Sequence, residues 1–219
     1  MDSNKITKET LIISITSIVI IEGAAHAVAS GTKLDPLLLI GAARLLQAIS
    51  MVTIVMVWGK GLASVGITRS EIGAGLKRGL LWCAGFGILV SLALLVSLFT
   101  GIDPHGCIRI SLPERPGDIL LFLFVAGFMG PVAEEIFFRG ILYGFLRRWG
   151  ILAALFLTTL LFVLAHPMGV TMPVIQAVGG ILFAAAYEVE KNLIVPVVIH
   201  VLGNMAIFML VLLHYYTGN

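Results

Sequence analysis

Charged residues are scarce in this sequence. Asp, Glu, Lys and Arg make up 12% of its 219 residues, whereas about a quarter is usual in soluble domains. Hydrophobic residues make up 59%, and the mean hydropathy is +1.06. This composition excludes a soluble globular domain. It predicts an integral membrane protein built from helices, because backbone exposed to lipid must satisfy its hydrogen bonds within the chain.

Basic runs are absent and cysteines are few. The formal net charge is only +2, and no basic run with interleaved aromatic residues occurs, so no nucleic-acid partner is expected. Cys83 lies in an apolar stretch and Cys107 in a polar loop. These two cysteines imply no disulfide framework.

Apolar stretches of helical length recur along the chain. They fall at roughly 10–29, 36–58, 78–100, 118–147, 150–166, 173–188 and 193–213, compared with the ~20 residues that a helix needs to cross a bilayer. The sequence therefore predicts an all-α, polytopic membrane bundle of about seven transmembrane helices. The fifth and sixth stretches are short, and Pro167 and Pro173 lie in the link between them. A tilted, broken or re-entrant course is open for both.

We predict a single membrane domain over residues 1–219, with an interfacial linker at 59–77 and an external loop at 101–117. Basic residues are unequally divided between the two sets of loops, which predicts a cytoplasmic N-terminus and an external C-terminus. The loops on the N-terminal side contain Lys5, Lys8, Lys60, Arg69, Lys77, Arg78, Arg147, Arg148 and Lys191, whereas the other side has Lys33, Arg109 and Arg115. We expect residence in a prokaryotic inner membrane.

Two adjacent glutamates, Glu134 and Glu135, interrupt the fourth apolar stretch, and Arg139 follows one turn later. An ionised side chain inside a bilayer costs several kcal/mol, so it indicates a functional site by default. Other apolar stretches also contain polar residues. These include His166, four residues after Phe162, and the pair His200 and Asn204, also four residues apart and therefore on one helix face.

These side chains, if they converge, suffice for hydrolysis. A carboxylate can act as general base on a water, and an imidazole can orient that water or protonate the leaving group. A second imidazole and an amide can donate hydrogen bonds to a developing oxyanion. Arg139 can hold one carboxylate ionised and fix its rotamer.

The patterns Glu134-Glu135-x-x-x-Arg139, Phe162-x-x-x-His166 and His200-x-x-x-Asn204 resemble, in order, the three motifs of the CAAX-protease and bacteriocin-processing (Abi) family of intramembrane glutamic proteases. The turn at 190–193 and the stretch at 66–79 also look like segments of that family. The resemblance makes about 118–210 the catalytic core and 1–117 peripheral helices with the linker. It implies cleavage of a membrane-associated peptide or protein without a metal or other cofactor.

The resemblance also implies a role for each motif residue. The implied roles are general base for Glu134, its partner on the water for His166, oxyanion stabilisation for His200 and Asn204, and support for Glu135 and Arg139.

Three alternatives stay open. Intramembrane Glu, His and Arg also mark proton relays, so a small proton-coupled transporter would fit, although carriers usually contain repeats and none is evident. Two histidines and two glutamates could bind zinc in a metal-dependent protease, but no His-Glu-x-x-His occurs and Arg139 disfavours a dication. A non-catalytic scaffold would predict broken motifs, and here they are intact.

A second polar group lies in the first two apolar stretches. Glu22 and His26 are four residues apart in the first stretch, and Arg44 lies in the second. We expect them to form a buried charge cluster that is structural rather than functional. A role in gating the substrate is the alternative.

The depth of the last helix is a further question. At 1.5 Å per residue, Glu134 lies roughly 20 Å from Arg147, whereas His200 lies only about 14 Å from Lys191. If both basic residues mark the membrane edge, the last helix must be tilted or must start deeper than the others.

Overall fold

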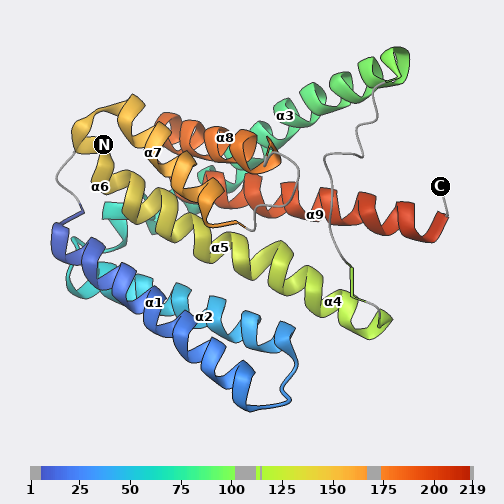
Figure 1. Ribbon diagram of the computed structural model, residues 1–219. Coiled ribbons are helices and arrows are strands. Elements are labelled where there is room, and N and C mark those ends of the chain that lie inside the picture. The colour runs from blue at the N-terminus through green and yellow to red at the C-terminus, as the bar shows by residue number, and fades with distance from the viewer. Residues whose placement is uncertain (1–5, 102–111, 114, 167–173, 218–219) are drawn as a thin grey trace.

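The structure is a computed structural model that describes residues 6–101, 112–113, 115–166 and 174–217. Over these residues the chain is helical and contains no strand. The all-α bundle predicted from the sequence is therefore confirmed, and its helices lie side by side in Figure 1. Most of the expected external loop, together with Cys107, Arg109, Pro167 and Pro173, falls outside the described residues.

The described helices form seven rods, in agreement with the seven apolar stretches. Six are simple: α1 (Lys8–Gly31), α2 (Pro36–Val57), α3 (Ile72–Thr100), α7 (Ile151–Leu164), α8 (Val174–Glu190) and α9 (Ile194–Thr217). The seventh, here called the central rod, runs without a break through α4 (Pro116–Phe124), η4 (Val125–Met129), α5 (Gly130–Glu135), η5 (Ile136–Tyr143), α6 (Gly144–Leu146) and η6 (Arg147–Trp149).

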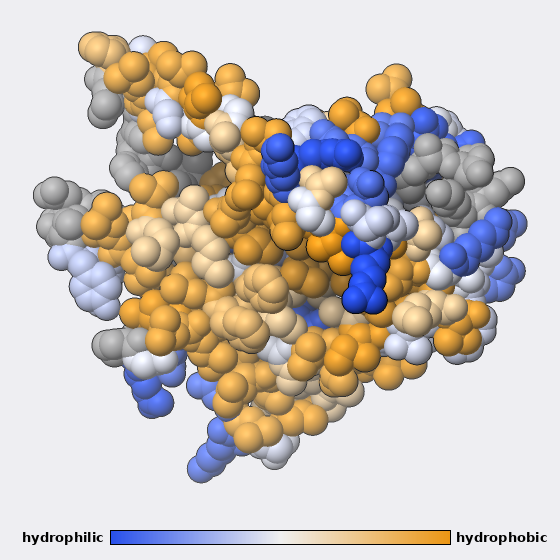
Figure 2. Space-filling model, turned by 180° about the vertical axis from the view of Figure 1, so that it is seen from behind, coloured by the Kyte–Doolittle hydropathy of each residue, from blue (hydrophilic) through white to orange (hydrophobic). Residues whose placement is uncertain are grey.

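Five of these rods are long and apolar enough to cross a membrane by length and composition: α1, α2, α3, the central rod and α9. Helix α7 is apolar but has only 14 residues, and α8 has 17, so the prediction of short fifth and sixth helices is confirmed. Apolar residues cover most of the face in Figure 2, and hydrophilic residues gather mainly at one end. The protein is an integral membrane protein.

Local sequence explains where the first two helices start. The Thr7 side chain accepts a hydrogen bond from the Thr10 amide at the start of α1. The Asp35 carboxylate caps the Leu37 and Leu38 amides at the start of α2, where Pro36 lacks an N–H to satisfy. These caps define an α1–α2 hairpin.

The predicted interfacial linker at 59–77 is partly helical. Two short 3₁₀ turns, η1 (Leu62–Val65) and η2 (Arg69–Glu71), follow α2, and α3 already begins at Ile72. The last six residues of the predicted linker therefore belong to a helix.

The central rod carries both glutamates and is the most buried of the candidate spans. Of the 18-residue apolar segment that marks each span, 39% is buried in the central rod, compared with 6% in α1 and in α3. It is π-helical on both sides of the glutamates, over η4 and over η5. π-Helical turns are rare and frequently occur at functional sites.

The turn between α8 and α9 is buried beneath the segment that joins α2 to α3. The Leu193 amide donates to the Gly66 carbonyl at 3.2 Å, and Asn192 Nδ2 donates to the Glu71 carbonyl at 2.9 Å. Gly66 has φ +79°, and a Cβ on it would lie 2.7 Å from the Lys191 carbonyl oxygen. Helix α9 therefore starts inside the protein rather than at its surface.

Helix α3 packs closely along α9 because its contact face contains glycine. A Cβ added to Gly79 would lie 2.7 Å from Val198 Cβ and 3.3 Å from the Val195 carbonyl oxygen. Neither atom belongs to a flexible chain end, so the two helices would have to separate.

We therefore expect Gly79→Ala to lower the free energy of unfolding by about 1–3 kcal/mol, the range for overpacking a core. Gly85→Ala is the matched control. Gly85 lies on the same helix, and a Cβ added there would have no neighbour within 4 Å. Thermal unfolding in detergent measures both. Equal midpoints for the two variants would contradict the close α3–α9 contact.

Candidate active site

A buried ion pair lies at the centre of the bundle. Glu135 and Arg139 are both 0% exposed, and Arg139 Nη1 donates to Glu135 Oε1 at 2.9 Å. Arg139 Nη2 donates to the Gly180 carbonyl of α8 at 3.2 Å. The guanidinium carbon also lies 4.6 Å from the centre of the Phe162 ring. One arginine thus joins the central rod to α7 and α8.

The same glutamate oxygen also holds a histidine of α9. His200 Nδ1 lies 2.7 Å from Glu135 Oε1, and a carboxylate paired with Arg139 can only accept, so Nδ1 carries the hydrogen. The His200 ring stacks on Phe183 with centroids 4.5 Å apart and planes 22° apart. These contacts fix the ring orientation and turn Nε2 towards Glu134.

His166, at the end of α7, is oriented by the backbone of its own segment. Its Nδ1 lies 2.7 Å from the Phe162 carbonyl oxygen, which only accepts, so Nδ1 is again the protonated nitrogen. The Nε2 atom is therefore the one left for chemistry.

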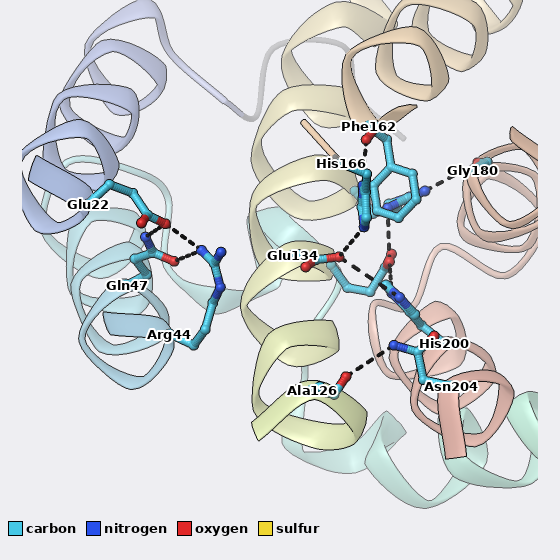
Figure 3. A network of polar contacts seen from close by, with 12 residues as sticks. Glu22, Arg44, Gln47, Ala126, Glu134, Phe162, His166, Gly180, His200 and Asn204 are labelled. Atoms are coloured by element: carbon cyan, nitrogen blue, oxygen red, sulfur yellow. Dashed lines mark hydrogen bonds and ion pairs between the residues drawn. The ribbon is translucent and has the colours of Figure 1, made fainter. Parts of the chain in front are cut away.

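Glu134 is the point on which both rings converge (Figure 3). Its Oε2 lies 3.8 Å from His166 Nε2 and 3.9 Å from His200 Nε2. These distances exceed a hydrogen bond, so a polar atom between them could contact all three groups. In the neutral rings both Nε2 atoms are acceptors, because each Nδ1 holds the hydrogen.

Asn204 lies one turn beyond His200 on α9 and faces the central rod (Figure 3). Its Nδ2 donates to the Ala126 carbonyl at 3.1 Å. Ala126 belongs to the π-helical η4. The amide has two N–H groups, and this bond uses only one of them.

The structure thus brings the six predicted site residues together. Glu135, Arg139 and His200 are joined by hydrogen bonds, Glu134 and His166 lie within 4 Å of one another, and Asn204 lies one turn from His200 on α9. The expected charge cluster forms only in part, separately from this site. Arg44 Nη1 donates to Glu22 Oε1 at 2.7 Å, but the two side chains are 30% and 47% exposed, so the expectation of a buried cluster was wrong. His26 lies outside that cluster, and its ring has no polar partner among the described residues.

Several contributors were missed from the sequence. The Gly180 and Ala126 groups act through backbone carbonyls, which no side-chain pattern reveals. Phe183 is one of many aromatic residues in an apolar helix, and only its contacts with His200 and Arg139 distinguish it.

Among the described residues, no group of three or more His, Cys, Asp and Glu side chains is placed to hold a metal ion.

Part of the chain is similar to known proteins. Residues 116–206 match the family described as type II CAAX prenyl endopeptidase Rce1-like, a segment that includes all six predicted site residues. This segment is therefore similar to the CAAX protease family. The membrane-embedded CAAX protease MroQ of Staphylococcus aureus (strain USA300) is 34% identical to this chain over 93 residues. That match covers 39% of this chain and 37% of the relative's length. No solved structure gives a significant match.

We expect Arg139→Met to lower the free energy of unfolding by about 3–5 kcal/mol, since it leaves a buried carboxylate unpaired. The double variant Glu135→Gln/Arg139→Met should recover part of that loss, because it removes both charges. Thermal unfolding in detergent measures the series. A double variant no more stable than the single variant would show that the pair does not act as a unit.

Proposed function

We propose that this protein is an intramembrane glutamic endopeptidase that hydrolyses peptide bonds of membrane-associated proteins or peptides. The observation that carries the proposal is the convergence of two imidazole Nε2 atoms on one oxygen of Glu134, at 3.8 and 3.9 Å. The family match and the MroQ relative support peptidase activity. A transporter has no comparable support.

In the proposed reaction, a water lies between Glu134 and His166. Glu134 removes one proton while the water oxygen bonds to the scissile carbonyl carbon, and His166 Nε2 accepts the other hydrogen bond and orients the water. The carbonyl π electrons move onto its oxygen. The tetrahedral intermediate then expels the amine, which receives the proton held by Glu134, and the products are a carboxylic acid and an amine.

The oxyanion is stabilised from α9 in this mechanism. Asn204 retains one N–H after its bond to Ala126. His200 can donate from Nε2 only as an imidazolium, because Nδ1 already donates to Glu135. We propose that Glu135, paired with Arg139, supports that charged form. Glu135 and Arg139 are thus positioning residues rather than catalytic ones.

We also propose that the N-terminus faces the cytoplasm of a prokaryotic cell and that the protein resides in its inner membrane. The support is the excess of Lys and Arg in loops on that side.

Glu134→Gln should lower kcat by about 10²–10⁴-fold, the usual contribution of a general base, while the unfolding midpoint changes little. The assay uses purified protein in liposomes with a mixed library of quenched-fluorescent, lipid-anchored peptides, and products are identified by mass spectrometry. Glu71→Gln is the matched control, because that carboxylate is 52% exposed and pairs only with Arg78 among the described residues. Full activity of Glu134→Gln would refute the mechanism.

Activity should also survive removal of metal ions. We expect incubation with 1,10-phenanthroline or EDTA to leave the cleavage rate within about twofold, because Glu134 and the imidazoles activate water as a base without a Lewis acid. Loss of activity with chelator and its recovery with added zinc would favour the metal-dependent alternative instead.

A further inference from the structure

The charge cluster of α1 and α2 is a closed set of three side chains. Arg44 Nη1 donates to both Glu22 Oε1 and Gln47 Oε1 at 2.7 Å, and Gln47 Nε2 donates to Glu22 Oε1 at 2.8 Å. Gln47 is 2% exposed and forms the buried end of the set. Figure 3 shows Arg44 on the side of α2 that faces the central rod.

The outer edge of this cluster is open. The side chains of Arg44 and Glu22 are 30% and 47% exposed, and Arg44 Nε and Nη2 and Glu22 Oε2 have no hydrogen-bond partner in the described part of the chain. Both residues lie well inside their spans. Open charged atoms at that depth are costly, and such residues usually line a route for a polar ligand.

The cluster lies near the candidate active site. Helix α2 and the central rod run in the same direction (Figure 1). Gly41 contacts Val125 near the start of both, and Val65, beyond the end of α2, contacts Gly140. Arg44 is three residues past Gly41 and Glu134 is nine past Val125. The two therefore differ in level along the rods by about six residues, or roughly 9 Å. A peptide strand that runs along the rods, with the Arg44 side chain reaching across to it, covers that offset in about three residues.

The charges select the kind of ligand. Glu22 would repel a carboxylate or a phosphate, and Arg44 would repel a cation. A donor edge beside an acceptor edge, with no net charge, matches a neutral group that has both a C=O and an N–H. The peptide group is such a partner, and an extended peptide inside a bilayer must find hydrogen bonds for its backbone.

We propose that the Glu22–Arg44–Gln47 cluster binds the main chain of an extended peptide about three residues from the bond held at Glu134. Arg44 donates to a backbone carbonyl, and Glu22 Oε2 accepts from a backbone N–H. Gln47 positions both. This inference rests on the proposed peptidase function and adds a specificity that depends on backbone rather than on side chains.

An ester scan tests the proposal. The probe is a lipid-anchored peptide that the wild-type protein cleaves in the library assay, remade with each amide in turn replaced by an ester, which removes the N–H and weakens the carbonyl acceptor. Binding to the Glu134→Gln protein in nanodiscs is measured by fluorescence anisotropy. We expect one ester, about three residues from the scissile bond, to weaken binding about tenfold or more.

That penalty should depend on the cluster. In the Glu134→Gln background, adding Glu22→Gln/Arg44→Met should make the amide and ester peptides bind equally, and Arg44→Lys should reduce the penalty. His26→Ala, one turn from Glu22 and outside the cluster, should preserve the penalty.

The outcomes are distinguishable. Two results would overturn this inference while leaving the proposed peptidase function intact, provided that the wild-type protein cleaves the peptide. In the first, the ester still weakens binding in the Glu22→Gln/Arg44→Met background. In the second, no ester at any position weakens binding. Absence of cleavage by the wild-type protein overturns the proposed function and this inference with it. If the double substitution unfolds the protein, the Arg44→Lys variant decides instead. An ester penalty as large in that variant as with Arg44 in place also overturns the inference.

Discussion

One carboxylate oxygen, Glu135 Oε1, organises the interior of this bundle. It accepts from Arg139 Nη1 and from His200 Nδ1, and so joins two turns of the central rod to α9, while Arg139 continues to α8. Burying such charges costs several kcal/mol per ion, and even here Glu135 Oε2 and Arg139 Nε have no partner among the described residues. An apolar core would be more favourable for stability alone, so the pair is better explained by the orientation that it imposes on His200.

That orientation also depends on how deep α9 begins. Counted from Lys191, His200 is too close to a charged membrane edge to meet Glu134. The structure resolves this difficulty because the turn is itself internal: Asn192 and Leu193 are 4% and 0% exposed. Trp82 Nε1 adds a bond to Glu190 Oε1 at 2.9 Å. The segment from η1 to α3 therefore sets the level of His200 and Asn204, although it contributes neither of them.

Sequence reasoning predicted the helices and the polar residues that meet, because apolar length and i, i+4 spacing are local properties. It did not predict the partners. Arg139 and Glu135 could be paired from spacing, but the bond from His200 to Glu135, rather than to Glu134, depends on how α9 packs. The π-helical η4 and η5 have no local signal in the apolar sequence. The Gly180 and Ala126 carbonyls become specific acceptors only when distant helices approach them.

The two polar clusters differ in a way that suits different tasks. Around Glu134 the two imidazole rings are held by hydrogen bonds from their Nδ1 atoms to Glu135 and to the Phe162 carbonyl, an arrangement that would orient reactive atoms. Around Arg44 a neutral pair is left open between a lightly buried hairpin and the central rod. A site that must admit many sequences cannot bind side chains tightly, whereas the backbone is common to all of them. In the proposed peptidase, an open donor and acceptor near an oriented base would therefore separate recognition from chemistry.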